Sequence, residues 1–243
     1  MLAMTGRAPV DWYALETPVP QFRLRLCRLS RIELVHSGTT PGSEMTNYRA
    51  DYLTPEALSN MPFKSLGHDV MMHERVTLVG IENISIGSHV RIDPEVILLA
   101  TGPLTIGCYT HIASGVFIGA KAGFEMKNFT NIAHGARIYT INDDYSGEHL
   151  MGPTIPAEFL SLSPGAVLLE EHANIGAGAI VLPGVTLAEG SVLGALSLIS
   201  RSTEPWTIYG GVPAKPIKER RRDVIREGQE LLKSDWFMQK STR

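Results

Sequence analysis

Aliphatic residues recur at every sixth position over long stretches of this 243-residue chain. The clearest run starts at Leu169 and continues, always six residues further on, through Ile175, Val181, Leu187, Leu193 and Ile199. Shorter runs with the same spacing lie upstream: Leu66 and Met72; Ile86 and Ile92; Ile106, Ile112 and Ile118; Met126, Ile132 and Ile138. Six residues advance an α-helix by about 240° beyond a full turn, so the pattern does not keep to one helix face.

The six-residue period predicts a triangular coil of parallel strands. Each unit supplies one short strand and one corner, three units complete a turn, and the aliphatic residue points inward at the same place in every turn. Small residues, which fit tight corners, follow most of the aliphatic positions. An antiparallel β-sandwich is the alternative, but it would give alternation with variable spacing. We therefore expect an all-β fold, a parallel β-helix.

The period is interrupted near residues 98–103 and 121–125 and, most extensively, between Ile141 and Leu168. Insertions into a solenoid lie at its corners and commonly carry function. The insertion loop at 142–165 is therefore the first place to look for a site.

The rest of the chain flanks the expected coil, which covers residues 64–204. Residues 1–44 should form a poorly ordered extension, with a basic amphipathic segment at a membrane surface as the alternative. Residues 45–63 should form a short helical lead-in, where Thr54-Pro55-Glu56 is typical of a helix start. Residues 205–243 should form a Gly/Pro-rich exit loop and a C-terminal α-helix that caps the open end of the coil. The apolar face of that helix would comprise Ile217, Val224, Ile225, Leu231 and Leu232.

Composition narrows the class of protein. Hydrophobic residues make up 44% and charged residues 19%, as in a globular domain. A net charge of −3 gives no indication of nucleic-acid binding. No apolar run is long enough for a membrane span, and no secretion signal is recognisable. The two cysteines form no disulfide framework, so we expect a cytoplasmic protein without integral membrane contact.

The repeats, together with the segment Ile208-Tyr-Gly-Gly-Val-Pro-Ala-Lys-Pro-Ile217, resemble the hexapeptide-transferase superfamily over about Lys64 to Leu232. The resemblance implies a left-handed parallel β-helix, use of an acyl-coenzyme A, and a homotrimer whose active sites lie between subunits. A narrower likeness is to nucleotide-sugar N-acyltransferases of O-antigen and related glycan pathways, including those acting on dTDP-4-amino-4,6-dideoxyglucose. It is carried by Asn142–Glu148, Pro153–Glu158, Gly194–Leu198 and Ile217–Arg220.

The insertion departs from the pattern of the sugar and maltose O-acetyltransferases of the superfamily. These carry a catalytic histidine there, often just before an aspartate, whereas this chain reads Asn142-Asp-Asp-Tyr145. An amine needs less activation than a hydroxyl, because its neutral form is already a good nucleophile. The departure therefore favours an amine acceptor.

Acyl transfer from a thioester needs a nucleophile, a destination for its proton and donors for the oxyanion. His111, expected at a corner, is a candidate base or substrate orienter, or else a solvated corner residue. His134, one turn further on, could join the same face. Asp143 could accept a proton from the ammonium or orient a sugar hydroxyl, or it could belong to an ordinary polar turn.

Asn142, Asp144 and Tyr145 are the candidates for binding the acceptor substrate, because they lie in the longest insertion. Asp144 could orient a sugar hydroxyl, and Tyr145 could stack on a base or sugar; the alternative is a polar turn in which Tyr145 only pins the loop.

Candidates for binding acetyl-coenzyme A lie towards the C-terminus. Six basic residues between Lys215 and Arg226 could attract phosphates, chiefly Lys215 and Arg220, or could be a solvated helix face. Small side chains could let a pantetheine arm lie against the coil, or could simply pack at corners. These are Ala177, Gly194, Ala195 and Ser197.

These observations predict an acyltransferase that moves an acetyl group from acetyl-coenzyme A to the amine of a nucleotide-linked sugar by direct attack on the thioester. A sugar O-acetyltransferase is one alternative. A non-catalytic or metal-dependent β-helix, such as a γ-carbonic-anhydrase-like relative, is another, but His111 and His134 supply at most two of its three histidine ligands. We expect no metal, because five other histidines show no metal-ligand spacing and should lie at the surface. They are His68, His73, His89, His149 and His172.

Overall fold

The structure is a computed structural model that describes residues 51–241. The predicted extension at 1–44 and the first part of the predicted lead-in lie outside the described residues. The described part begins with a short helix, α1 (Pro55–Ser59). Thr54 is its N-cap, because the Thr54 hydroxyl accepts a hydrogen bond from the Ala57 amide at 3.2 Å, and Pro55 occupies the first turn.

Three sheets follow. Outside the insertion and before β21, each strand pairs in parallel with the one that lies three strands further along the chain. The first sheet contains β1 (Ser65–Leu66), β4 (Ile84–Ile86), β7 (Leu104–Ile106), β10 (Phe124–Met126), β15 (Val167–Leu169) and β18 (Thr186–Leu187). The second contains β2 (Val70–Met72), β5 (Val90–Ile92), β8 (Thr110–Ile112), β11 (Asn131–Ile132), β16 (Asn174–Ile175), β19 (Val192–Leu193), β21 (Thr207–Gly211) and β22 (Ala214–Glu219). The third contains β3 (Thr77–Val79), β6 (Ile97–Leu99), β9 (Phe117–Gly119), β12 (Arg137–Tyr139), β17 (Ile180–Val181) and β20 (Leu198–Ile199).

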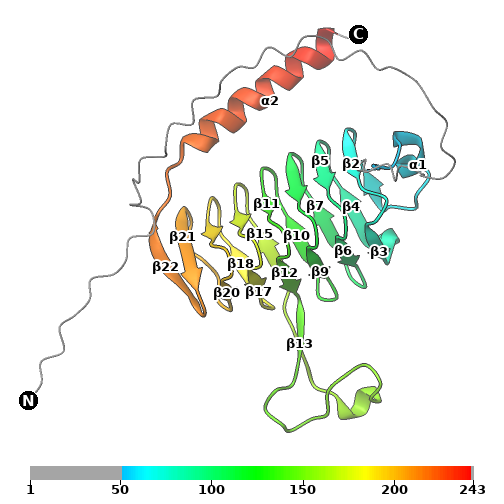
Figure 1. Ribbon diagram of the computed structural model, residues 1–243, viewed down its shortest axis with the longest axis vertical. Coiled ribbons are helices and arrows are strands. Elements are labelled where there is room, and N and C mark those ends of the chain that lie inside the picture. Colours follow the sequence, from blue (N-terminus) through cyan, green and yellow to red (C-terminus); the bar gives the residue numbers. More distant parts are fainter. Residues whose placement is uncertain (1–50, 242–243) are drawn as a thin grey trace, which may run out of the picture. The chain divides into compact units, whose positions relative to one another are not determined.

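Such pairing makes a coil with three strands per turn, and Figure 1 shows the strands as successive rungs. The predicted parallel β-helix is confirmed. We refer to its three edges as corner 1–2, corner 2–3 and corner 3–1, after the sheets that meet there. A 3₁₀ turn, η1 (Ile81–Asn83), lies at corner 3–1 of the first turn.

The residues of the six-residue period form the core. Ile112, Ile138 and Leu187, one from each sheet, have no exposed surface, and nearly every other member of the repeat is also buried. Stacked turns therefore bury a continuous apolar column, the stabilising principle of a solenoid.

The turns are of two lengths. Ile86 pairs with Ile106 and Ile106 with Met126, twenty residues apart, whereas Leu169 pairs with Leu187, eighteen apart. The longer turns explain the interruptions of the period near 98–103 and 121–125, because both segments lie at corner 3–1 and absorb the additional residues.

Corner 1–2 carries a column of aromatic rings. His89 stacks on Tyr109 with ring centroids 4.6 Å apart, Tyr109 stacks on Phe129 at 5.2 Å, and Phe129 stacks on His172 at 5.1 Å. All four residues have positive φ, between 55° and 61°. This conformation costs a non-glycine residue energy, and the stacking of rings from adjacent turns offsets part of that cost.

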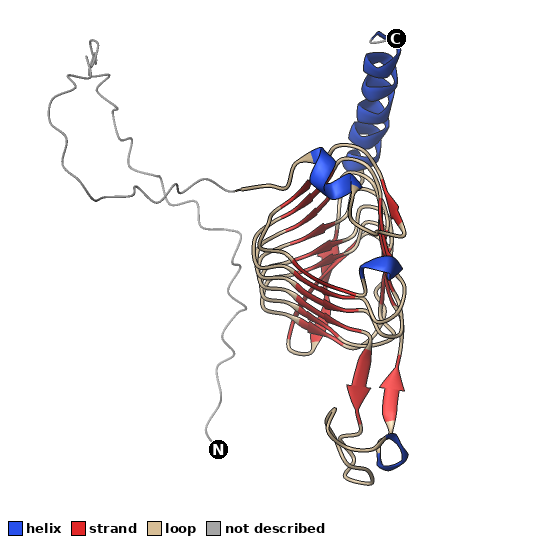
Figure 2. Ribbon diagram, turned by 90° about the vertical axis from the view of Figure 1, so that its right-hand side faces the viewer, coloured by secondary structure: helices blue, strands red, loops and turns tan. Residues whose placement is uncertain are grey.

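The insertion leaves the coil after β12 as a hairpin of β13 (Ile141–Asp143) and β14 (Leu162–Pro164), with η2 (Ala157–Phe159) in its distal part. Figure 2 shows that this arm projects beyond the rungs of the coil. Several large apolar side chains of the arm are exposed. They are Tyr145, Leu150, Met151, Phe159 and Leu162.

The C-terminal part differs from the prediction in three respects. The expected exit loop is an antiparallel pair, β21–β22, and β21 also extends the second sheet beyond β19. The helix α2 (Asp223–Ser241) therefore begins after Ile217, which belongs to β22, and the prediction that Ile217 lies on the helix is wrong.

The prediction that α2 caps the coil is also wrong. Gly228 of α2 faces the rings of Phe129 and His172 at the side of the coil, and Leu231 and Leu232 stay about half exposed. The β21–β22 pair follows the last turn instead, because the β-branched Ile208 and the aromatic Tyr209 favour a strand. No helix among residues 51–241 is long and apolar enough to span a membrane.

Candidate functional site

A buried carboxylate organises the outer surface of the second sheet near corner 2–3. Asp93, whose side chain is 8% exposed, accepts hydrogen bonds from the Tyr52 hydroxyl at 2.9 Å and the Arg91 guanidinium at 2.7 Å. The His111 imidazole lies 2.8 Å away, from Nε2 to Asp93 Oδ2. Burial alone would raise the pKa of Asp93, but the hydrogen bonds from His111, Arg91 and Tyr52 together lower it to about 2.

His111 differs from its predicted position. It lies in the middle of β8 rather than at a corner, because the turn places Ile112 inward and His111 outward on the strand. Its Nδ1 lies 3.0 Å from Asn131 Oδ1, so both ring nitrogens have partners. Tyr52, Arg91 and Asp93 were not identified from the sequence, because Asp93 meets Tyr52 and His111 only across turns of the coil.

Corner 2–3 brings three of the predicted residues into one row. The amide of Gly178 donates to the carbonyl of His134, and the amide of Leu196 donates to the carbonyl of Ala177, each at 2.8 Å. His134, Ala177 and Ala195 therefore occupy the same slot in successive turns. Ala177 and Ala195 are exposed, and among residues 51–241 their amide nitrogens donate to no other group. The row thus offers small side chains and available N–H donors along the coil axis.

Gly194 and Ser197 are less accessible than the two alanines. The Gly194 amide donates to the Tyr209 carbonyl at 2.8 Å, and the buried Ser197 hydroxyl accepts from the Gly211 amide at 3.0 Å. Both residues hold β21 against the last turn, so their structural contribution is direct, and their predicted contact with coenzyme A stays a prediction.

The arm contains the predicted acceptor residues. Asn142 and Asp143 lie in β13 opposite Ser163 and Leu162, and Tyr145 is 77% exposed near the turn that follows. Asp144 accepts a hydrogen bond from the Ser146 amide at 2.8 Å and pairs with Nδ1 of His149 at 2.9 Å.

Hydrogen bonds from Ser146, followed by the one from His149, lower the pKa of Asp144 to about 2. His149 is a further residue that was not assigned to a site from the sequence. It is half exposed as predicted, but the loop folds it back onto Asp144. The insertion therefore does contain a histidine–aspartate pair.

The last turn contains a pocket of about 450 Å³ next to Lys215. Its lining includes Ser200, Arg201 and Ser202 from the end of β20 together with Pro213 and Lys215 from the exit segment. Two cationic side chains and two hydroxyls in a concave site can bind phosphate groups. Arg201 was not identified from the sequence, since it lies outside the basic run.

Arg220 lies elsewhere. Its Nη1 donates to the carbonyls of His172 and Gly190 at 2.8 and 2.9 Å, and its guanidinium lies 5.9 Å from the ring centre of Trp206. Burial lowers the pKa of Arg220. These contacts give it a structural role in joining the exit segment to the coil, and its predicted contact with coenzyme A stays a prediction.

Two of the remaining histidines also differ from the prediction that they lie at the surface. His73 is buried, and its Nδ1 accepts a hydrogen bond from the Arg75 amide at 3.0 Å. His172 is partly buried in the aromatic column, where burial lowers its pKa.

Comparison with known proteins agrees with this geometry, although no family model matches the chain. A dTDP-4-amino-4,6-dideoxy-D-glucose acyltransferase from Escherichia coli is 38% identical over 175 residues, which cover 72% of this chain and 91% of the relative. A chloramphenicol acetyltransferase from Klebsiella aerogenes is 43% identical over 73 residues, 30% of this chain and 34% of the relative. A variant of AntD, an N-acyltransferase from Bacillus cereus, was solved with dTDP-4-amino-4,6-dideoxyglucose and coenzyme A. It has a TM-score of 0.74 and 39% identity, and the match covers 76% of this chain and 100% of AntD.

The coil, the projecting arm and the exit segment define a hexapeptide-repeat acyltransferase that uses an acyl-coenzyme A. Within this class, the identity over most of both chains is decisive. The protein belongs to the family of the dTDP-4-amino-4,6-dideoxy-D-glucose acyltransferase.

Proposed function

We propose that this enzyme transfers an acetyl group from acetyl-coenzyme A to the amine of a nucleotide-linked amino sugar, with dTDP-4-amino-4,6-dideoxyglucose as the first candidate. The observation that carries the proposal is the 38% identity, over 91% of its length, to an acyltransferase named for that sugar. AntD, which matches the coil, was solved with the same sugar nucleotide and with 3-hydroxybutyryl-coenzyme A. A longer acyl group is therefore the variable to test on the donor side.

In this proposal the coenzyme lies along corner 2–3. The amides of Ala177 and Ala195 would donate to the carbonyls of the pantetheine arm, and the exposed methyl groups would leave room for it. The pocket beside Lys215 and Arg201 would receive phosphate groups. The row of small residues at corner 2–3 and the pocket at the last turn would together hold the donor.

The acceptor would be held by the arm, through Asn142, Asp143, Asp144 and Tyr145. Its neutral amine attacks the thioester carbonyl carbon, the tetrahedral intermediate collapses, and the coenzyme leaves as a thiolate that takes up the proton lost by the amine. The polar residues of the arm orient the amine, and orientation alone contributes several kcal/mol to the lowering of a barrier.

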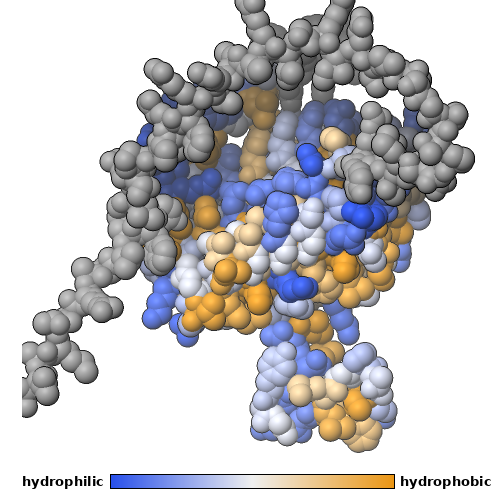
Figure 3. All heavy atoms as spheres, viewed as in Figure 1, coloured by the Kyte–Doolittle hydropathy of each residue, from blue (hydrophilic) through white to orange (hydrophobic). Residues whose placement is uncertain are grey.

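We infer that the active form is a homotrimer. The arm begins at corner 3–1 and the row of small residues lies at corner 2–3, on opposite edges of the third sheet, so a second copy has to bring the two together. The outer surface of this sheet is largely apolar, with Arg137 as an exposed exception: Val79 and Ile97 are about 40% exposed, and Phe117 packs against Tyr139 with ring centroids 5.4 Å apart. In Figure 3, apolar surface gathers along the edge of the coil from which the arm projects and on the arm itself. A trimer would bury this surface.

One observation favours the alternative acceptor, a sugar hydroxyl. His149 pairs with Asp144 on the arm, and a carboxylate that orients an imidazole is the arrangement by which a hydroxyl can be deprotonated. The O-acetyltransferase therefore remains the second candidate, in O-antigen or related glycan synthesis. We retain a cytoplasmic location as part of the proposal, because the two cysteines are no disulfide framework.

The decisive experiment compares two acceptors that differ at one atom. Release of free thiol from acetyl-coenzyme A is followed with dTDP-4-amino-4,6-dideoxyglucose and with its 4-hydroxy counterpart at equal concentration. We expect thiol release with the amine and little with the hydroxyl, in wild type and in His149→Gln alike. Preference for the hydroxyl, abolished by His149→Gln, would establish the alternative. No release with either acceptor would refute both.

A further inference from the structure

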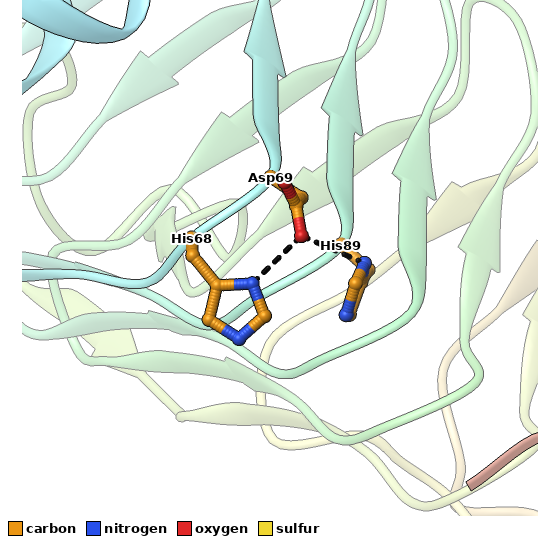
Figure 4. Close-up of side chains that lie close together, drawn as sticks. All are labelled: His68, Asp69 and His89. Carbon is orange, nitrogen blue, oxygen red and sulfur yellow. Dashed lines mark hydrogen bonds and ion pairs between the residues drawn. The ribbon is translucent and has the colours of Figure 1, made fainter. Parts of the chain in front are cut away.

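A second cluster of chemically active side chains lies far from the arm, at the N-terminal end of the coil. Figure 4 shows His68, Asp69 and His89 converging on one point. Nδ1 of His68 lies 2.8 Å from Oδ2 of Asp69, and Nδ1 of His89 lies 3.5 Å from the same oxygen. The ligand atoms of all three residues lie within 4.8 Å of one another.

We propose that His68, Asp69 and His89 form a binding site for a zinc ion that links the first turn of the coil to the second. This goes beyond the acyl transfer proposed above and does not depend on it. Two imidazoles and one carboxylate are a common ligand set for zinc, with a fourth position for water. The ligand set cannot be recognised from the sequence spacing, because the two histidines lie twenty-one residues apart, one turn of the coil plus one residue.

The distances suit the ion. In a tetrahedral zinc site with bonds of about 2.0–2.1 Å, neighbouring ligand atoms lie about 3.3 Å apart. The two separations from Asp69 Oδ2, 2.8 and 3.5 Å, lie on either side of this value. Small side-chain rotations therefore convert the present hydrogen-bonded cluster into a coordination sphere.

The backbone that carries the ligands is held in place by the coil. The amide of His89 donates to the carbonyl of His68 at 3.0 Å, and the amide of His68 donates to the Ser88 hydroxyl at 3.1 Å. Asp69 and His89 both have positive φ, 54° and 57°, at corner 1–2. The ring of His89 is fixed further by its stacking on Tyr109. A preorganised set of ligands loses little entropy when the metal binds.

A second group of potential ligands on the arm is a weaker candidate and provides the internal control. Asp144, Glu148 and His149 also approach within 4.8 Å of one another. That group has one imidazole instead of two, and Asp144 is already engaged by the Ser146 amide and by His149. Zinc prefers nitrogen donors, so the N-terminal cluster should bind it first.

Zinc at this site would stabilise the end of the coil. The strands β1 and β2 are the outermost members of their sheets among the described residues, and the end of a solenoid is where local opening starts. An ion held by both turns would oppose that opening. Zinc is then expected to slow amide hydrogen exchange in residues 65–72 more than in the last turn.

The test is equilibrium dialysis of the untagged, chelator-treated full chain against zinc chloride, combined with hydrogen exchange. We expect one zinc ion per chain for wild type and for His149→Gln. His89→Phe and Asp69→Asn should each weaken binding at least about tenfold, since loss of a direct ligand costs no less than loss of an outer-shell partner. His89→Phe preserves the stacking, because Phe129 adopts the same backbone conformation at the same corner two turns later. Asp69→Asn provides an independent variant, because asparagine tolerates positive φ.

Three results would overturn the proposal. They are the absence of stoichiometric zinc binding by wild type, loss of the zinc in His149→Gln, and retention of full affinity in both His89→Phe and Asp69→Asn. Zinc binding that leaves exchange in residues 65–72 unchanged would overturn the inference that the ion links the two turns.

Discussion

Replacing Asp93 with asparagine should destabilise the coil at neutral pH and much less in acid. The ionised carboxylate serves three donors at once, Tyr52, Arg91 and His111, and these hydrogen bonds outweigh the cost of its burial. Its pKa is lowered from 3.8 to about 2. This lowering corresponds to about 2 kcal/mol of stabilisation by the charged form at pH 7. Asparagine keeps one acceptor oxygen but no charge, so most of that stabilisation should be lost.

The sign of the pH dependence follows from the direction of the shift. Because the pKa is lower in the folded chain, the unfolded chain binds more protons in acid, and stability falls as the pH falls. The contribution is complete above about pH 5, roughly halved at pH 3 and lost below about pH 2. Asparagine does not titrate, so the difference between wild type and Asp93→Asn should shrink over the same range.

Urea unfolding of both proteins at pH 7 and pH 3, at one fixed protein concentration, measures this difference. Asp223→Asn is the matched control, because the Asp223 carboxylate is 50% exposed and pairs with the exposed Arg221, so that its loss should change stability little. Equal stability of wild type and Asp93→Asn at pH 7, or a difference that does not change with pH, would refute the reasoning.

Three further predictions concern the proposed site. Ala177→Phe should raise the KM for acetyl-coenzyme A at least about tenfold without lowering the melting temperature, because a large side chain at this exposed corner blocks the coenzyme but does not disturb the fold. Thr101→Phe, a change at an exposed residue of corner 3–1, should leave this KM unchanged, and equal effects of the two substitutions would contradict the placement of the coenzyme. Phe117→Arg should convert trimers into smaller species in light scattering, because it removes an apolar side chain from the third sheet and places a second positive charge beside Arg137. A wild type that is monomeric at micromolar concentration would disprove the trimer. His111→Ala and Asp143→Asn should each lower kcat/KM for an amino-sugar acceptor by less than about 100-fold, and activity should partly recover as the pH rises, because more of the acceptor is then the free amine. If a variant binds both substrates but is inactive at every pH, the altered residue is an obligatory base.

The core could be predicted from the sequence because it depends on one repeated local rule. Ile112, Ile138 and Leu187 are inward for the same reason, and each was identified from spacing alone. The exit segment was misjudged because glycine and proline in Gly210–Pro216 suggested a loop, while pairing with β19 decided the outcome for Ile208 and Tyr209. Tertiary pairing overrides local composition in such segments.

The polar clusters could not be found in the same way. Asp93 meets His111 and Tyr52 only because adjacent turns and the lead-in are wound against each other, and His68 meets His89 only because the early turns have twenty residues. The spacing of residues within one strand or one helix does not predict these contacts. His149 illustrates a different limit, since a loop without repeated structure brings it to Asp144.

Because the coil is built from stacked turns, the positions of equivalent residues along its axis differ by fixed steps. Neighbouring turns lie about 4.8 Å apart, the distance between hydrogen-bonded strands. The arm leaves after β12, and the pocket beside Lys215 lies beyond β20, two turns further on. A single residue inserted within a strand would turn core positions such as Val181 outward, whereas the corners absorb additional residues. The length of the coil along its axis therefore changes only by a complete turn. Deleting the eighteen residues from Leu169 to Thr186 should preserve the core and bring the arm one turn of the coil nearer to the pocket. The distance between the donor phosphates and the acceptor amine can therefore change only in steps of one turn, and a coenzyme of fixed length fits only one number of turns.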